Sequence, residues 1–564
     1  MGFLDYAGTL SLQKDPLKVK ILIDSRWAYP GLGWDGSMPV VRVPEPRTSD
    51  EAIEFLGYVF PPDETGKIRV GRLFRAAVTH LTAHTLMGQP PTEATSHPAR
   101  FTGTLLRDLQ ADAYVAASHP ERLADLAYAN ALAVSSMKRL ERIYLPATRV
   151  MTAILSKALA GRLNGELAEA EIQLVEEVLD RLSEAKEIYA ASLNGEETNV
   201  DELEETAGWI AGRIGELGPF VETPGFPHAE NASSCSIYVQ RSPPRDQEIE
   251  PYFMDAMDAL GGAPPDGGAM VSCWGRAVDV ECLQAFSSTI IQREKERKVL
   301  RRLEERLSQS RFKSIEIPEP AYSEYLRARE LIGGSSRRLL NSIIVATNFE
   351  FEDIRKKYGV LDLADAIQVI ASKSPRNDIF MRDEIMKRSF SIAILLDVSR
   401  SMRTTPLENR ARAICVAEAA KDIITDPHSW AFYAFSDRLY VLKDGSEAYS
   451  RRVRARIGGV PLDGATYMAD ALRAAADFLK GKLEEQRIIF VLSDGYPFGY
   501  PDADEEVKET VRFYEEKGII IIGIGFDTAR MESLFRYSTA VYDQRDLIKK
   551  VGSIFLQASR EELI

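Results

Sequence analysis

The apolar run Ile392–Leu396, followed at once by Asp397, constrains the fold of this chain more than any other stretch. An uninterrupted run of mostly branched apolar residues predicts a strand that is buried on both faces of a parallel sheet. Just beyond it, Asp397, Ser399 and Ser401 stand at alternate positions. Open α/β sheets bind their ligands at the carboxyl ends of strands, so these side chains are candidates for a binding site. One carboxylate and two hydroxyls are hard oxygen ligands, which suit Mg²⁺.

Two later stretches carry the same oxygen chemistry. Thr466 ends the run Asp463-Gly-Ala-Thr, directly before a predicted helix at 467–479. Asp494 follows a second apolar strand at 488–493. Together with the first loop, these residues place acid and hydroxyl groups on three separate loops at the edge of one predicted sheet. Such a set is suited to a divalent cation.

These positions resemble the metal ion-dependent adhesion site (MIDAS) of the von Willebrand factor A (vWA) domain. The matching residues, in the order of that family, are Asp397, Ser399, Ser401, Thr466 and Asp494. The resemblance implies that these five residues hold Mg²⁺ or another divalent cation. It also implies a doubly wound, Rossmann-like α/β fold for the C-terminal part of the chain.

The order of elements in the last third of the chain predicts the same fold. Apolar runs alternate there with amphipathic ones, which predicts a mainly parallel sheet with helices on both faces. The predicted strands are 390–397, 430–436, 439–442, 488–493, 519–525 and a short one at 540–542. The predicted helices are 407–425, 467–479, 505–517 and 547–557.

The length of 564 residues is too great for one hydrophobic core. We therefore expect a multidomain protein with four parts. A mostly helical N-terminal domain is predicted at 1–217. Its first 65 residues are expected to form loops with short strands, among them 18–24, and apolar residues recur at helical spacing from about residue 68. A Pro- and Gly-rich irregular segment or linker is predicted at 218–275. A helical middle region is predicted at 276–383, and the vWA domain at 384–564.

Charge and cysteine content limit the class of protein. The formal net charge of −14 argues against nucleic acid and anionic membranes as partners, because both need a basic protein surface. The four cysteines lack CxxC spacing, which fits a reducing compartment. Cys235, Cys273 and Cys282, with His228, are too irregularly spaced to predict a metal site. No export signal or membrane span is visible, so we expect a cytoplasmic protein.

The region before the predicted vWA domain resembles a narrower group of proteins that contain this domain. Tyr358-Gly-Val-Leu-Asp362, Asp378-Ile-Phe-Met-Arg382 and the loop after Asp494 are similar to proteins of the NorD/CbbO type. The similarity extends, more distantly, to the CobT subunit of cobalt chelatase. It implies two partners: a hexameric MoxR-family AAA+ ATPase, and a client metalloenzyme that offers an acidic side chain to the cation. The vWA protein would then be an adaptor, a chaperone-like cofactor in activation, maturation or metal insertion.

Four further residues are candidates for contacts with a partner. Arg400 stands inside the first predicted metal loop, where its charge would steer a client carboxylate toward the ion. Tyr496 lies in the extended loop after the last metal aspartate. Arg451 and Arg452 begin a basic cluster that could meet an acidic partner, although such clusters are more often solvated helix faces.

The sequence lacks a strong signature of catalysis. No G-x-x-x-x-G-K-[ST] stretch occurs in it, so ATP hydrolysis is expected in the partner and this chain is expected not to be an enzyme. His80 and His84 have the spacing of a zinc-binding helix, with Asp108 and Asp112 as possible neighbours. Leu81 stands where a metallopeptidase needs glutamate, so helix-face histidines with polar partners are the simpler interpretation. A metal-dependent enzyme, or a metallochelatase subunit, is the alternative function.

Overall fold

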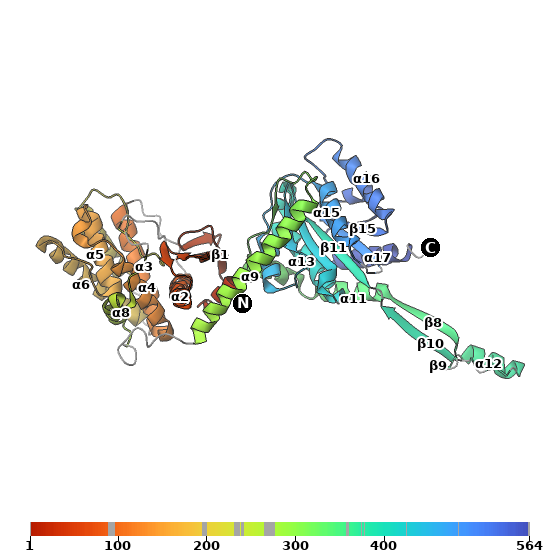
Figure 1. The fold of residues 1–564 in the computed structure, drawn as a ribbon, viewed down its shortest axis with the longest axis horizontal. Coiled ribbons are helices and arrows are strands. Elements are labelled where there is room, and N and C mark those ends of the chain that lie inside the picture. The colour runs from red at the N-terminus through yellow and green to blue at the C-terminus, as the bar shows by residue number, and fades with distance from the viewer. Residues whose placement is uncertain are drawn as a thin grey trace. The chain divides into compact units, whose positions relative to one another are not determined.

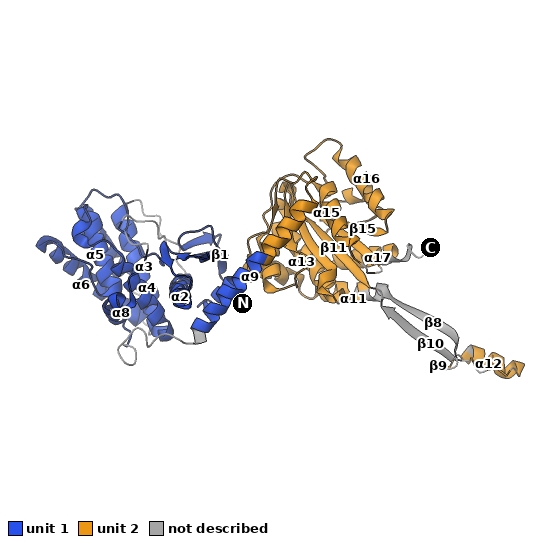
Figure 2. Ribbon diagram, in the orientation of Figure 1, with its two compact units in different colours: residues 1–294 blue, residues 295–564 orange. Residues whose placement is uncertain are grey.

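A computed structural model describes the chain except for residues 1, 88–95, 194–199, 231–236, 239–241, 264–276, 357–359, 362, 374, 377, 379, 388, 425, 483, 485 and 562–564. The described residues form two compact units, Met1–Glu294 and Lys295–Ile564 (Figure 2). Helix α9 (Ala277–Arg306) spans the boundary between the units. None of the described helices combines the length and the apolar content needed to cross a membrane.

The first unit is mainly helical, as predicted (Figure 1). Its helices before α9 are α1 (Phe3–Leu10), α2 (Glu64–Met87), α3 (His97–Ser118), α4 (Leu123–Ser135), α5 (Pro146–Ala160), α6 (Glu169–Leu193), α7 (Val200–Gly215) and α8 (Asp246–Ala259). Two three-stranded sheets, ordered β1-β3-β2 and β4-β5-β6, lie between α1 and α2 in sequence. Their strands are β1 (Lys20–Asp24), β2 (Gly31–Asp35), β3 (Met38–Pro44), β4 (Arg47–Thr48), β5 (Ile53–Phe55) and β6 (Tyr58–Phe60).

Helix α2 lies in the middle of this unit. It contacts α1, α3 and α4 as well as three strands, and most of its side chains are buried, charged ones included. The buried guanidinium of Arg75, for example, binds Asp125 at 2.8 Å and Asp279 at 2.9 Å. A charge taken out of water must find such partners, because an unpaired buried ion costs several kcal/mol, roughly. The polar residues of α2 are therefore parts of the core.

Helix α8 lies inside the segment 218–275 that the sequence predicts as irregular. Its buried residues Ile249, Phe253 and Ala256 recur at helical spacing. Clusters of proline and glycine on both sides of the helix hide this short signal. Cys235 and Cys273 of the same segment lie outside the described residues.

The second unit is built on a seven-stranded sheet with the order β16-β15-β14-β11-β12-β13-β7. All neighbouring strands pair in parallel except β12 and β13. The strands are β7 (Ile315–Glu316), β11 (Phe390–Asp397), β12 (Trp430–Phe435), β13 (Leu439–Lys443), β14 (Gln486–Ser493), β15 (Ile519–Phe526) and β16 (Tyr537–Val541). The helices that follow β11 are α13 (Pro406–Ile423), α14 (Arg451–Gly459), α15 (Met468–Lys480), α16 (Ala503–Glu515) and α17 (Gln544–Glu561).

Strand β11 lies at the centre of this sheet and is buried on both faces (Figure 1). Its side chains alternate between two hydrophobic clusters, as the pleat of a strand requires. Ile394 and its neighbours on that face belong to the cluster that includes α13 and α17. Leu395 belongs to the cluster that includes α15 and α16. The predicted doubly wound, Rossmann-like α/β fold is confirmed.

The predicted middle region, 276–383, is helical in part. Helices α10 (Tyr322–Ile332) and α11 (Ser335–Thr347) contact α13, and strand β7 extends the large sheet by pairing with β13. A separate antiparallel sheet has the order β8-β10-β9, formed by β8 (Asn348–Lys356), β9 (Val360–Leu361) and β10 (Phe380–Lys387); α12 (Leu363–Ser372) lies between β9 and β10 in sequence. A two-residue strand such as β7 is set by its tertiary contact, so no sequence pattern indicates it. The three predicted boundaries between the four parts stay predictions.

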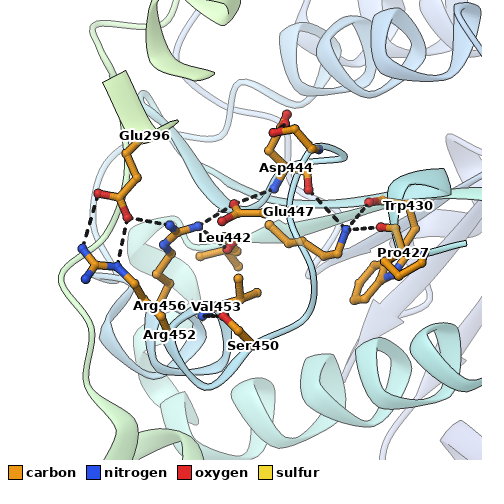
Figure 3. A network of polar contacts seen from close by, with 12 residues as sticks. Glu296, Pro427, Trp430, Leu442, Asp444, Glu447, Ser450, Arg452, Val453 and Arg456 are labelled. Carbon is orange, nitrogen blue, oxygen red and sulfur yellow. Dashed lines mark hydrogen bonds and ion pairs between the residues drawn. The ribbon is translucent and has the colours of Figure 1, made fainter. Parts of the chain in front are cut away.

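A buried ionic network joins α9 to α14 in the second unit (Figure 3). Arg456, which is 1% exposed, donates to Glu447 and to Glu296, both at 2.7 Å. Glu296 also accepts a hydrogen bond from Arg452 at 3.0 Å. Near this network, the ammonium of buried Lys443 donates to backbone carbonyls at 2.7–3.2 Å, and burial lowers its pKa to about 8. The network anchors the last turns of α9 to the sheet unit.

We predict that Arg456→Ala destabilises the second unit by about 3 kcal/mol, because it leaves the partly buried Glu447 carboxylate without this cation. Hydrogen exchange of the α14 and β13 peptides in the full chain measures the effect. Arg306→Ala is the matched control on α9, since the Arg306–Asp477 pair is exposed and its loss costs less than about 1 kcal/mol. Equal protection in the two variants would contradict the assigned role of Arg456.

Candidate metal centre

The first predicted metal loop begins where β11 ends. Asp397 is fully buried, and its Oδ1 accepts a hydrogen bond from the Ser399 backbone N–H at 2.9 Å. This contact turns the chain back over the carboxylate. The hydroxyl oxygens of Ser399 and Ser401 lie 3.0 Å apart, with Ser399 buried and Ser401 exposed. The loop therefore presents two hydroxyls between a buried carboxylate and solvent.

Backbone hydrogen bonds tie the other two loops to this one. Arg400 N donates to Gly464 O at 3.2 Å, and Asp463 N donates to Val398 O at 2.8 Å. The loop that holds Asp494 is joined in turn to this second loop, which holds Asp463, Gly464 and Thr466.

This second tie is a short β-bridge. Thr466 and Phe498 exchange backbone hydrogen bonds of 2.9 and 3.3 Å. The bridge fixes buried Thr466 beside the loop that carries half-buried Asp494. All five predicted ligands consequently stand on loops joined at the carboxyl ends of β11 and β14.

The electrostatics of the centre fit a cation. Burial, together with the nearby Asp494 carboxylate, raises the pKa of Asp397 to about 7. Two neighbouring carboxylates that are shielded from water repel each other unless a proton or a cation lies between them. Carboxylate and hydroxyl oxygens are the ligands that Mg²⁺ accepts, and the set contains no sulfur or imidazole that would favour a softer metal. The residues present therefore suit a hard divalent cation, with Asp397 and Asp494 as the charged ligands.

Ser493 is a contributor that the sequence analysis missed. Its hydroxyl donates to Asp397 Oδ2 at 2.5 Å and accepts from Gly495 N at 3.0 Å. It holds the Asp397 carboxylate in place from the neighbouring strand. The available signal was a hydroxyl residue at the last position of an otherwise apolar strand, directly before Asp494.

The residues predicted to meet a partner lie in different surroundings. The Arg400 side chain is 77% exposed and lies 3.9 Å from Asp463, while Tyr496 is 57% exposed in the third loop. Arg451 stacks over the ring of Tyr322, and Arg452 is bound to Glu296. The first two thus stand on the metal loops, and the last two contact α10 and α9. Partner binding by these four residues stays a prediction.

Comparison with known families identifies the sheet unit. Residues 392–497 match the family model of the von Willebrand factor type A domain. The C-terminal unit contains a vWA domain. All five predicted ligands fall within the matched span. An uncharacterized protein of Pseudomonas aeruginosa is 29% identical to this chain over 137 residues. The match covers 22% of this chain and 22% of the relative's length.

Solved structures that the chain resembles include three with low identity. Proximal thread matrix protein 1 of the mussel byssus, described with a zinc-occupied MIDAS motif, is 15% identical with a TM-score of 0.26 and covers 30% of this chain and 48% of its own. The manganese-loaded TRAP protein of Plasmodium vivax is 12% identical with a TM-score of 0.24, and the match covers 30% of this chain and 74% of that protein. The PilB minor pilin of Streptococcus sanguinis is 13% identical with a TM-score of 0.24, and the match covers 34% of this chain and 67% of that protein.

We predict that Ser493→Ala weakens divalent-cation binding at the vWA centre about 10- to 100-fold, the usual effect of removing a group that orients a ligand. Calorimetric titration of the full chain with Mn²⁺ measures this change. Ser533→Ala is the control, because the Ser533 hydroxyl donates to the nearby Arg530 backbone carbonyl on an exposed turn. Unchanged Mn²⁺ affinity in folded Ser493→Ala would show that Ser493 does not position Asp397 for the ion.

Proposed function

We propose that this chain is a non-catalytic adaptor of a MoxR-family AAA+ ATPase. In this proposal it recruits a client metalloenzyme through a Mg²⁺-dependent contact at the vWA centre. The ATPase then drives activation, maturation or metal insertion in the client. The location would be the cytoplasm, and neither nucleic acid nor a membrane would take part.

The observation that carries the proposal is the arrangement of donors from a buried base to an exposed rim. Asp397 is fully buried, whereas Ser401 and Arg400 are exposed on the same loop. Mg²⁺ takes six ligands in near-octahedral geometry and usually keeps several waters. The protein supplies at most five ligating side chains, so at least one of the six positions is left for solvent or for a client carboxylate. The geometry suits a cation that a second protein completes.

The surface around the rim suits a protein partner. Tyr496 and Phe498 are 57% and 71% exposed in the third metal loop, and Phe498 is bridged to Thr466. Aromatic side chains are enriched among the residues that contribute most to binding at protein interfaces. An exposed aromatic pair beside a cation would combine apolar contact with charge recognition.

The ATPase partner rests on the sequence. The segments before and after the metal loops are similar to NorD/CbbO proteins, and the chain has no phosphate-binding loop of its own. We therefore assign ATP hydrolysis to the partner. A metallochelatase subunit remains the second function of the same type, and it would require a tetrapyrrole-binding subunit.

We predict that Asp397→Ala abolishes client capture while leaving the ATPase bound. The full chain is immobilised with Mg²⁺ present, exposed to native lysate, and its bound proteins are identified. The expected result is a MoxR-type ATPase with both baits, and a metalloenzyme only with the wild-type bait. Adding a chelator should release the same metalloenzyme from the wild type.

Asp422→Ala is the matched control for this experiment. Asp422 is an exposed aspartate near the last residue of α13, a helix of 18 residues that is about 27 Å long and begins just after the first metal loop. Capture of the client by Asp422→Ala and by wild type should be equal. Undiminished capture by Asp397→Ala, or the absence of any AAA+ ATPase from both baits, would contradict the proposal.

We also predict that Arg400→Glu slows association with the acidic client at least tenfold at low salt, because it reverses a charge beside the ion. Stopped-flow or surface-binding kinetics with the captured client measure the rate. Arg438→Glu, which reverses an exposed charge in the turn between β12 and β13, is the control. An association rate independent of both the Arg400 charge and the salt concentration would exclude electrostatic steering by this residue.

A further inference from the structure

A second cluster of ligand-type side chains lies in the core of the first unit. His80 and His84 stand one turn apart on α2, and Asp108 and Asp112 stand one turn apart on α3, which packs against α2. These four residues are buried, with exposed fractions between 2% and 7%. The cluster belongs to neither the vWA domain nor the proposed client contact.

Three donor atoms of this cluster form a nearly equilateral triangle. His80 Nε2 and His84 Nε2 are 3.1 Å apart, and each is 3.3 Å from Asp108 Oδ1. An ion bound tetrahedrally at about 2.0–2.1 Å separates its ligand atoms by about 3.3 Å. The three atoms therefore stand where three corners of a tetrahedral site would be.

Hydrogen bonding accounts for one edge of this triangle, between the two imidazole nitrogens, but not for the two edges to Asp108. Asp108 Oδ1 has no hydrogen-bond partner within the described residues, although two imidazole nitrogens lie 3.3 Å away. A buried carboxylate oxygen that lacks a partner costs about 1–3 kcal/mol or more. Both imidazole nitrogens thus lie at ion-pair distance from Asp108 Oδ1 without making a hydrogen bond to it. A cation between the three atoms would satisfy all of them.

Asp112 completes the pattern from the other side of the His80 ring. Its Oδ1 lies 3.2 Å from His80 Nδ1. A histidine that donates its Nδ1–H to a carboxylate keeps the Nε2 lone pair for a metal, which is the usual support of a metal-bound imidazole. Asp112 is therefore a positioning residue for His80.

His228 lies beside the cluster and is itself buried. Its ring centroid is 5.9 Å from that of His80, and its Nδ1 has no hydrogen-bond partner in the part of the chain that the structure describes. Asp108 and His228, each with an unpartnered polar atom among the described residues, thus both lie beside the His80 ring.

We propose that His80, His84 and Asp108 bind one zinc-type divalent transition-metal ion in the first unit. Two imidazoles and one carboxylate favour zinc over Mg²⁺, because Mg²⁺ prefers an all-oxygen set. The deep burial of the ligands assigns the ion a structural role: it ties α2 to α3. This ion is distinct from the cation of the vWA centre.

The test uses Co²⁺ as a spectroscopic probe of the full chain. Metal-stripped wild-type protein should bind one Co²⁺ with the visible absorption of a tetrahedral nitrogen–oxygen site, and Zn²⁺ should displace it. His84→Ala and Asp108→Asn should lose this absorption. Asp397→Ala, which damages only the vWA centre, and His119→Ala, a half-buried histidine just after α3, should keep it.

Circular dichroism checks that each variant is folded. A folded wild type without the tetrahedral Co²⁺ absorption would overturn the proposal, as would folded His84→Ala and Asp108→Asn variants that retain it. If these two variants do not fold, Asp112→Asn decides the question, since it keeps all three ligands. A Co²⁺ affinity about 10- to 100-fold weaker in Asp112→Asn supports the site, and an unchanged affinity overturns it.

Discussion

A carboxylate buried at the end of the central strand is the constraint on which the C-terminal unit depends. Asp397 ends a strand covered on both faces, so its charge cannot be met by water. Hydrogen bonds from Ser399 N and Ser493 Oγ hold its two oxygens, yet its pKa is raised to about 7. A cation is the remaining way to stabilise the ionised form, and the three loops joined by backbone hydrogen bonds supply the oxygens around it.

The two units meet the cost of buried polar groups in the same manner. In the second unit, Arg456 is neutralised by Glu296 and Glu447. In the first, α2 carries histidines whose neighbours on α3 are aspartates at ligand distance. Breaking either set leaves a charge or a lone pair inside the protein, which is more costly than losing an exposed pair. In both units, a buried polar cluster therefore links elements that are distant in sequence.

The sequence was sufficient for the vWA sheet because local pattern and burial agree there. The predicted strand 390–397 coincides with β11, and the ligand loops follow from where β11 and β14 end. Other features depend on contacts distant in sequence. The pairing of β7 with β13, the Ser493 hydroxyl bound to Asp397, and the binding of Arg452 by Glu296 leave no local pattern. The spacing of His80 and His84 was visible, but its meaning required the packing of α2 on α3.

Whether the cation of the vWA centre keeps a coordination position open can be measured directly. Mn²⁺ is bound to the His84→Ala variant of the chain, which lacks one ligand of the proposed site between α2 and α3, and water-proton relaxation counts the exchangeable waters on the ion. We expect at least one such water, which is displaced when acetate or a glutamate-containing peptide is added. An ion without exchangeable water, or one whose water no carboxylate displaces, would contradict recognition of a client through this site.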